Sequence, residues 1–319
     1  MSNSAEHWKS NRRQFLAAGG AAIVTTSLFA RDATAAVPPS RREPLLGFSL
    51  YGMKSLPLGE ALQQCATIGY QCVELPVLAD WPADTATFSS AAKADFRASL
   101  KKHSLRLSAI MDNLPIVGDD TKHRSNLQRL QQAAELSHEL VADDPPLVET
   151  VLGGKPAQWD EVKQQLVDRL GDWSTVMAKA EVKLAIKAHI SNAIQRPEQL
   201  LWVIDQVKSP WLTAAYDYSH FELQKLPLDE TIQTLKKHMT FAHVKDTQGE
   251  PGKFQFLLPG EGKTDYKRLF SSLVQADYQG DIVVEVSGQI HSKPGYDPIA
   301  TAKKCFAALP PIPAYLPRR

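Results

Sequence analysis

The chain has 319 residues and a formal net charge of +1, with 43% hydrophobic and 22% charged residues. These values are ordinary for a globular protein, and they exclude the strongly basic surface expected of a nucleic-acid-binding protein. Three cysteines, Cys65, Cys72 and Cys305, are too few for a disulfide framework. A Cys65–Cys72 disulfide is conceivable in an oxidising compartment, although buried free thiols are the commoner case.

The first 35 residues have the pattern of an export signal. Arg12 and Arg13 precede Gln-Phe-Leu, the uncharged run 17–30 follows, and residues 33–35 (Ala-Thr-Ala) offer a small-residue cleavage site. The paired arginines resemble the twin-arginine motif, and the run is too short and weakly apolar for a stable membrane anchor. A basic N-terminus without a targeting role is the alternative. We therefore expect a periplasmic protein that engages the twin-arginine export machinery.

Cleavage after residue 35 leaves a nearly neutral mature chain. It removes four basic and two acidic residues, which leaves 32 basic and 33 acidic ones. Residues 36–44 are a Pro-rich lead-in, 45–309 are the expected folded domain, and 310–319 form a C-terminal tail. A balanced charge again argues against a nucleic-acid partner.

From residue 45 onward, short β-rich runs alternate with longer segments whose apolar residues recur at helical spacing. The eight runs are 45–52, 72–77, 105–112, 147–154, 182–189, 212–219, 239–246 and 281–288. Strands that alternate with helices favour parallel βαβ units, and eight such units predict a single α/β domain, the (β/α)8 TIM barrel. The fourth run is the least regular, because two aspartates and two prolines precede it. An open doubly wound sheet is the alternative, but no G-x-G-x-x-G follows the first run.

The last four runs end in polar residues. Active sites of such barrels lie at the carboxyl ends of the strands, and residues two apart in a strand share a face. If the first polar residue of each run points inward, Lys187, Asp217, His243 and Glu285 converge. Charged groups inside a barrel are costly unless they are paired or bind a metal, so this pattern predicts a site.

The residue types at these strand ends suit proton-transfer chemistry. Asp, His and Glu together would suit one divalent metal ion, Mn²⁺, Mg²⁺, Zn²⁺ or Co²⁺. Such a metal could bind two adjacent sugar oxygens and stabilise an enediolate. A carboxylate or lysine on the other side could then move a proton at the carbon next to a carbonyl.

Six motifs carry a family resemblance: GYQCVEL (69–75), LAIKAH (184–189), YDYSHF (216–221), FAHVKD (241–246), LPGEGKTDY (258–266) and IVVEVSG (282–288). With them the chain resembles the sugar phosphate isomerase/epimerase superfamily of xylose isomerase-like TIM barrels over about residues 45–309. The resemblance implies Asp217, His243 and Glu285 as metal ligands, with Glu285 also an acid or base. The resemblance says little about which substrate the protein takes.

One position departs from the superfamily pattern. The fifth-strand motif usually supplies a glutamate, and here the matching residue is Lys187. A protonated lysine repels a divalent cation and cannot bind it. Lys187 could therefore take the metal's place as a counter-cation, or a metal could bind through three ligands with Lys187 as base. Loss of catalysis is the third outcome.

The sequence as a whole predicts an exported carbohydrate-active enzyme that moves a proton next to a carbonyl of a sugar or keto-sugar. Isomerase and epimerase reactions fit, and a keto-glycoside lyase is conceivable; a sugar-binding pseudoenzyme with an altered metal site is the alternative. The candidate catalytic residues are Lys187, Glu285 and His189. The candidates for binding a small-molecule carbohydrate are Glu74, His220, Lys245 and His291. His291 lies in the segment 288–297, which we expect, like the loop 249–262, on the catalytic face.

Overall fold

The computed structural model describes residues 42–314 of the chain. The predicted signal peptide, most of the lead-in and the end of the tail lie outside these residues. Among the helices of the described part, none is long and apolar enough to cross a membrane.

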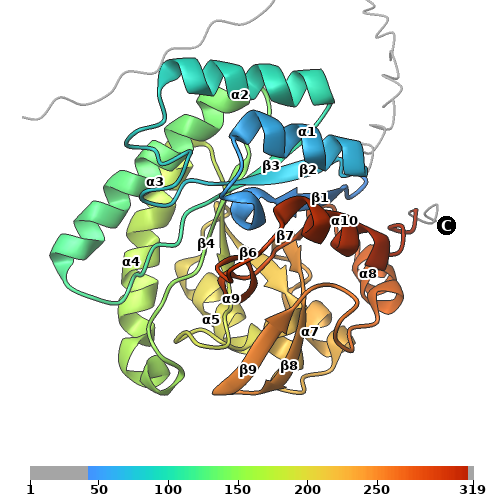
Figure 1. Cartoon of the computed structure of the whole chain (residues 1–319). Coiled ribbons are helices and arrows are strands. Elements are labelled where there is room, and N and C mark those ends of the chain that lie inside the picture. The colour runs from blue at the N-terminus through green and yellow to red at the C-terminus, as the bar shows by residue number, and fades with distance from the viewer. Residues whose placement is uncertain (1–41, 315–319) are drawn as a thin grey trace, which may run out of the picture. The chain divides into compact units, whose positions relative to one another are not determined.

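Eight parallel strands close into a barrel in the order β1-β10-β7-β6-β5-β4-β3-β2 (Figure 1). They are β1 (Leu46–Ser49), β2 (Cys72–Pro76), β3 (Arg106–Met111), β4 (Leu147–Thr150), β5 (Leu184–Lys187), β6 (Leu212–Asp217), β7 (Met239–Val244) and β10 (Asp281–Val284). Each run expected from the sequence contains one of these strands. The predicted (β/α)8 barrel is therefore confirmed, and the open doubly wound sheet is excluded.

Helices surround the strands, as Figure 1 shows. They are α1 (Leu58–Ile68), α2 (Ser90–His103), α3 (Asp120–Leu140), α4 (Trp159–Ala180), α5 (Pro197–Val207), α6 (Tyr218–Glu222), α7 (Leu228–Leu235), α8 (Tyr266–Gln275), α9 (Gly288–His291) and α10 (Pro298–Ala308). In α4, Leu166, Leu170, Trp173 and Met177 recur every three or four residues and are all buried. This spacing puts them on one stripe of the helix, which is why the helix packs on the barrel.

The barrel interior is layered, with an apolar layer below a charged one. The apolar layer consists of Cys72, Ala109, Ala185, Ala215, Phe241 and Val283. Side chains alternate along a strand, so residues two positions further along point inward one layer higher. These positions include Glu74, Lys187, Asp217, His243 and Glu285. The apolar layer therefore fills the barrel interior below, and the charged layer lies at the carboxyl end of the strands.

Residues 249–262, expected to be a loop, instead begin in a β-hairpin. β8 (Asp246–Glu250) pairs antiparallel with β9 (Lys253–Leu257), and the hairpin stands apart from the ring of helices in Figure 1. The alternation of Phe254 and Phe256 with polar residues is a strand pattern, and Phe256 is buried. Only the turn after β9 is irregular. There Asp246 Oδ2 accepts hydrogen bonds of 2.8 Å from the backbone N–H groups of Gly260 and Gly262.

The three cysteines are buried free thiols. Cys65 lies in α1 and Cys72 opens β2. The conceivable Cys65–Cys72 disulfide is therefore not formed in this fold.

Gly47 allows β1 to pack against Cys72. A Cβ atom at Gly47 would lie 2.5 Å from Cys72 Sγ and 2.7 Å from its carbonyl oxygen. Gly47→Ala is therefore expected to lower the free energy of unfolding by about 1–3 kcal/mol. Gly171→Ala in α4 is the control, because a Cβ there meets nothing within 4 Å, and it is expected to stabilise by up to about 1 kcal/mol. Urea denaturation measures both, and a Gly47→Ala variant as stable as the wild type would refute the packing argument.

Candidate active site

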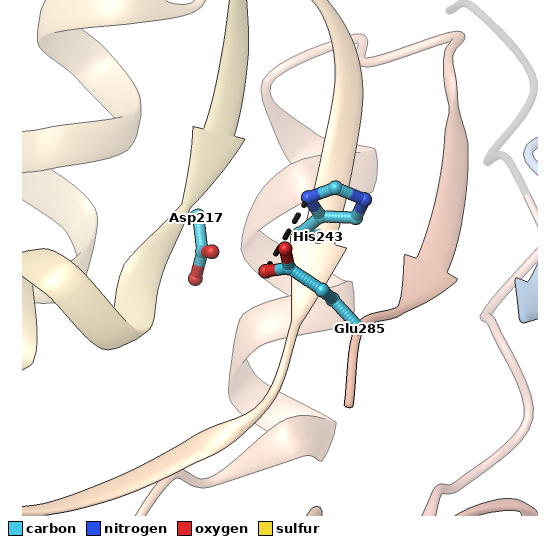
Figure 2. A group of neighbouring side chains, drawn as sticks. All are labelled: Asp217, His243 and Glu285. Carbon is cyan, nitrogen blue, oxygen red and sulfur yellow. Dashed lines mark ion pairs between the residues drawn. The ribbon is translucent and has the colours of Figure 1, made fainter. Parts of the chain in front are cut away.

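Three side chains that the sequence placed together meet at the barrel mouth (Figure 2). Asp217 is the last residue of β6, His243 lies opposite it on β7, and Glu285 follows β10 directly. Their potential ligand atoms all lie within 4.8 Å of one another, and His243 Nδ1 is 3.7 Å from Glu285 Oε2. By spacing and chemistry alone, this group could hold a metal ion.

Lys187, the last residue of β5, points into the same group. Its Nζ lies 2.9 Å from His243 Nδ1, 3.2 Å from both carboxylate oxygens of Glu285 and 3.4 Å from Glu149 Oε1. Burial lowers the pKa of Lys187, but the carboxylates of Glu149 and Glu285 outweigh it and raise that pKa above its ordinary value. The side chain is therefore an ammonium ion at neutral pH.

Lys245 lies one residue beyond β7 and bridges two of the candidate ligands. Its ammonium group donates to Asp217 Oδ2 and lies 2.5 Å from Glu285 Oε2. Lys245 was expected to bind substrate, and it shares a face with His243 as the two-residue spacing predicts. Its long side chain folds back between the carboxylates of Asp217 and Glu285.

Two further carboxylates lie beneath the group. Glu149 of β4, which the sequence reasoning missed, is completely buried beside Lys187. Burial raises the pKa of Glu149 to about 6, although Lys187 opposes this. Glu74 of β2 is also completely buried, and its Oε2 lies 3.0 Å from His243 Nε2. Glu74, a candidate for binding the carbohydrate, thus contacts His243 on the side away from the barrel mouth.

These contacts define the tautomer of the neutral His243 ring. Burial lowers the pKa of His243, but the Glu74 carboxylate outweighs it and raises that pKa above its ordinary value. An ammonium group only donates, so His243 Nδ1 accepts from Lys187. The ring proton therefore sits on Nε2 and is donated to Glu74. The lone pair that faces the barrel mouth is already used by Lys187.

His189 and His220 form a neutral pair beside the charged group. Their ring centroids are 4.2 Å apart, and Phe256 of the hairpin packs edge-on against both rings. Burial lowers the pKa of His220 to about 4 in spite of Asp217, whose Oδ2 lies 3.3 Å from His220 Nε2. The pKa of His189 also lies well below its ordinary value, mainly because the ring is buried and secondly because of the neighbouring His220.

Glu285 is the carboxylate of the group that reaches the solvent. Its side chain is 11% exposed, whereas those of Asp217, Glu74 and Glu149 are 0% exposed. Burial would raise the pKa of Glu285, but Lys187 and Lys245 outweigh it and hold that pKa well below its ordinary value. Glu285 is thus an ionised carboxylate at the mouth, the state that a general base requires.

A resident divalent cation does not fit these side chains as they are arranged. Asp217, His243 and Glu285 have suitable donor atoms and spacing. However, the ammonium groups of Lys187 and Lys245 lie against the same atoms, and both side chains are at most 4% exposed. A metal ion would have to displace two like charges from a buried site.

His291 lies in a neighbouring cavity on the same face. The cavity has a volume of about 540 Å³ and is lined by Tyr51, Gly52, Lys54, Ser55, Trp81, His291, Ser292 and Tyr296. The Tyr51 and Trp81 rings stack with centroids 4.9 Å apart, and His291 packs edge-on against Tyr51. Burial and then the charge of Glu285 raise the pKa of Tyr51, so the cavity lies within electrostatic reach of the charged group.

A parallel barrel with ionisable side chains gathered at the carboxyl ends of its strands belongs to the (β/α)8 class, whose active sites lie there. Within that class, the chain belongs to the xylose isomerase-like TIM barrel family, whose profile matches residues 62–307.

Relatives of the chain include sugar epimerases. L-ribulose-5-phosphate 3-epimerase UlaE of Salmonella paratyphi A is 25% identical over 258 residues, which is 76% of this chain and 87% of that protein. The fold is similar to a structure of the IOLI protein with a bound zinc atom, at a TM-score of 0.68 and 19% identity, covering 82% of this chain and 96% of that one. It is also similar to the structure of 3-keto-D-glucoside 4-epimerase YcjR of E. coli, with a TM-score of 0.65 and 15% identity. That match covers 83% of this chain and 98% of the other.

The buried neutral His220 predicts a pH-dependent stability. Its folded pKa of about 4 is below the ordinary histidine value, so its contribution is present above pH 6.5 and is lost as the pH falls from 6.5 towards 4. The loss is expected to reach about 1.4 kcal/mol per pH unit. The free energy of unfolding of the His220→Asn variant should therefore fall less steeply over this range. Urea denaturation of both proteins at pH 7, 6 and 5 measures it. Equal slopes for the two proteins would contradict this account.

Proposed function

We propose that the protein is a sugar isomerase or epimerase-like enzyme that moves a proton at the carbon next to a carbonyl group. One observation carries the proposal: the ionised, partly exposed Glu285 lies beside two ammonium groups at the barrel mouth. A carboxylate there can remove a proton from carbon, and the cations can stabilise the negative charge that develops on the substrate oxygen. Membership of a family whose relatives include sugar epimerases supports it.

Neutral His189 is the second proton carrier in this proposal. It stands beside His220 at the end of β5, and its Nδ1 accepts a hydrogen bond of 3.1 Å from the backbone N–H of Ser191. Its Nε2 therefore carries the ring proton. An epimerase needs a donor on the face opposite its base, and a neutral imidazole can fill that part. A keto-glycoside lyase would use the same base and give the proton to the leaving oxygen.

Solvent deuterium exchange tests the proposed reaction. Mature protein is incubated in D2O with a panel of keto- and aldo-sugars and keto-glycosides, and incorporation at carbon is followed by NMR. We expect exchange into at least one unphosphorylated sugar. Sugar binding by calorimetry with no exchange or turnover on the panel would instead identify a sugar-binding pseudoenzyme.

We also propose that the protein works in the periplasm after twin-arginine export. The paired arginines, the uncharged run and the Ala-Thr-Ala site at residues 33–35 support this proposal. A periplasmic location favours a free sugar, keto-glycoside or polyol over a phosphorylated metabolite as the substrate.

Replacing both Arg12 and Arg13 by Lys is expected to prevent export, because the twin-arginine signal is read as a pair. Cell fractionation followed by N-terminal sequencing measures the result. The wild type should be periplasmic and begin near residue 36, and the variant should keep its leader and stay in the cytoplasm. The variant Lys9→Arg, which leaves the pair intact, is the control. Unchanged export of the double variant would refute the assignment.

A further inference from the structure

The positions of two buried lysines carry one further inference. We propose that the ammonium groups of Lys187 and Lys245 together take the place of a divalent cation, and that Lys245 donates a hydrogen bond to the reacting oxygen of the substrate. The second half rests on the proposed function. The first half concerns only what the site holds, and it can be tested without a substrate.

Lys245 lies where a cation shared by Asp217 and Glu285 would lie. Its Nζ contacts Asp217 Oδ2 and lies 2.5 Å from Glu285 Oε2. The ring of Phe256 on the hairpin lies 5.0 Å from the same nitrogen and covers it from another side. An ammonium group has three N–H donors, and two of them serve the carboxylates. The third is the donor that this proposal assigns to a substrate oxygen.

Lys187 engages the remaining candidate ligand. Its Nζ donates to His243 Nδ1 over 2.9 Å and to both oxygens of Glu285 over 3.2 Å. The imidazole lone pair that a metal ion would require is thus used by an ammonium group, which itself offers no lone pair. Each of the three potential metal ligands in Figure 2 is therefore in contact with a lysine.

Lys187 and Lys245 bring the same charge to this group as one divalent cation would bring. Their two positive charges face the carboxylates of Asp217 and Glu285. Glu74 and Glu149 lie one contact further out, against His243 and Lys187 respectively. A divalent cation added to this group would face two ammonium ions with little solvent to screen them.

The two lysines, Glu285 and neutral His189 can carry out the proposed proton transfer without a metal ion. Glu285 accepts the proton from the carbon next to the carbonyl, and the electron pair of that C–H bond forms the C=C bond of an enolate. The carbonyl oxygen gains the negative charge and accepts a hydrogen bond from Lys245. Neutral His189 then donates its Nε2 proton to the opposite face of that carbon, the C=C electron pair forms the new C–H bond, and the C=O bond re-forms. Glu285 and His189 afterwards exchange protons with solvent, so no atom is lost and no oxidant or reductant is needed.

Metal analysis of the purified mature protein tests the replacement of the cation. The protein is dialysed without chelator and analysed for Mn, Mg, Zn and Co, and Mn²⁺ and Zn²⁺ are titrated into it in a calorimeter. We expect far less than one equivalent of metal and no stoichiometric binding. One tightly bound equivalent would overturn the proposal, as would deuterium exchange that disappears with EDTA and returns with the metal.

A double variant tests whether the lysines are what keeps the metal out. Lys187→Glu with Lys245→Met removes both ammonium groups and adds a carboxylate, so it is expected to bind one equivalent of Mn²⁺ or Zn²⁺ in the calorimeter where the wild type binds none. The control pair is Lys163→Met with Lys304→Met, two lysines that are at least 39% exposed. A folded double variant that binds no metal would overturn the proposal. If that variant does not fold, the wild-type analysis decides.

The two proposals fail in different ways. Metal-free protein with no exchange on the whole sugar panel supports the replacement of the cation and overturns the proposed function. If the protein is metal-free and its deuterium exchange into a sugar persists in EDTA, both proposals are supported. The variant Lys245→Met tests whether Lys245 donates a hydrogen bond to the substrate. We expect its rate of deuterium exchange to fall while its circular dichroism spectrum stays unchanged. An unaltered rate would overturn the proposed hydrogen bond.

Discussion

Replacing Glu285 by Gln is expected to lower the rate of deuterium exchange into the substrate by about 10²–10⁴-fold. The amide has the size of the carboxylate, so the variant can keep the packing at the barrel mouth. It cannot accept a proton from carbon, however, and it removes the negative charge that contacts both Lys187 and Lys245. The loss should appear mainly in kcat, because a base acts in the transition state rather than in substrate binding.

The measurement compares this variant with Glu139→Gln, an exposed carboxylate of α3 that pairs with Lys93. The control should keep the wild-type rate, which shows that loss of one negative charge elsewhere has no effect. Calorimetric binding of the same sugar should persist in Glu285→Gln. If that variant kept more than about a tenth of the rate, Glu285 would not be the base.

The fold could be predicted because each strand of the barrel is buried on both faces. Such strands are short apolar runs, and the helices between them show a different period, so all eight units are visible in the sequence. The predicted runs extend past the observed strands, as in the fifth, predicted over 182–189 and observed over 184–187. His189, which follows β5, belongs to the loop after the strand and does not continue the ladder.

The charged layer could be predicted in part, for the same geometric reason. Period-two alternation and parallel register place Asp217 opposite His243, and the next strand brings Glu285 beside them. Glu149 was not predicted, because the Asp and Pro residues before β4 make LVETV the least regular of the eight runs and leave its inward-facing positions undefined. A lone glutamate in a buried strand is itself a signal, since such a residue needs a cation.

The conformation of a long side chain could not be predicted. Sequence spacing places Lys245 on the face of His243, but it does not say whether the ammonium group points to the substrate or back to the carboxylates. The hairpin of β8 and β9 was also missed, because its Gly and Pro residues suggested a loop. That hairpin reaches the candidate site, since Phe256 packs against the rings of both histidines and lies 5.0 Å from the ammonium nitrogen of Lys245.

Replacing Lys187 by Met is expected to lower the free energy of unfolding by about 3–5 kcal/mol, because it leaves Glu149 buried without its cation. Within the described residues, neither carboxylate oxygen of Glu149 has a hydrogen-bond partner, and Lys187 Nζ is 3.4 Å away. Adding Glu149→Gln to this variant should recover part of the loss, since the uncompensated charge is then gone.

The loss in Lys187→Met should also depend on pH, and the sign follows from the pKa of Glu149. Burial already raises that pKa to about 6 with Lys187 present, and removal of the ammonium group raises it further. A carboxyl group whose folded pKa is raised contributes most stability when protonated, below its unfolded pKa, and loses it as the pH rises. Urea denaturation should therefore show a larger loss at pH 8 than at pH 5. A loss that is equal at both pH values, or that Glu149→Gln does not relieve, would mean that Lys187 stabilises the barrel through His243 and Glu285 rather than through Glu149.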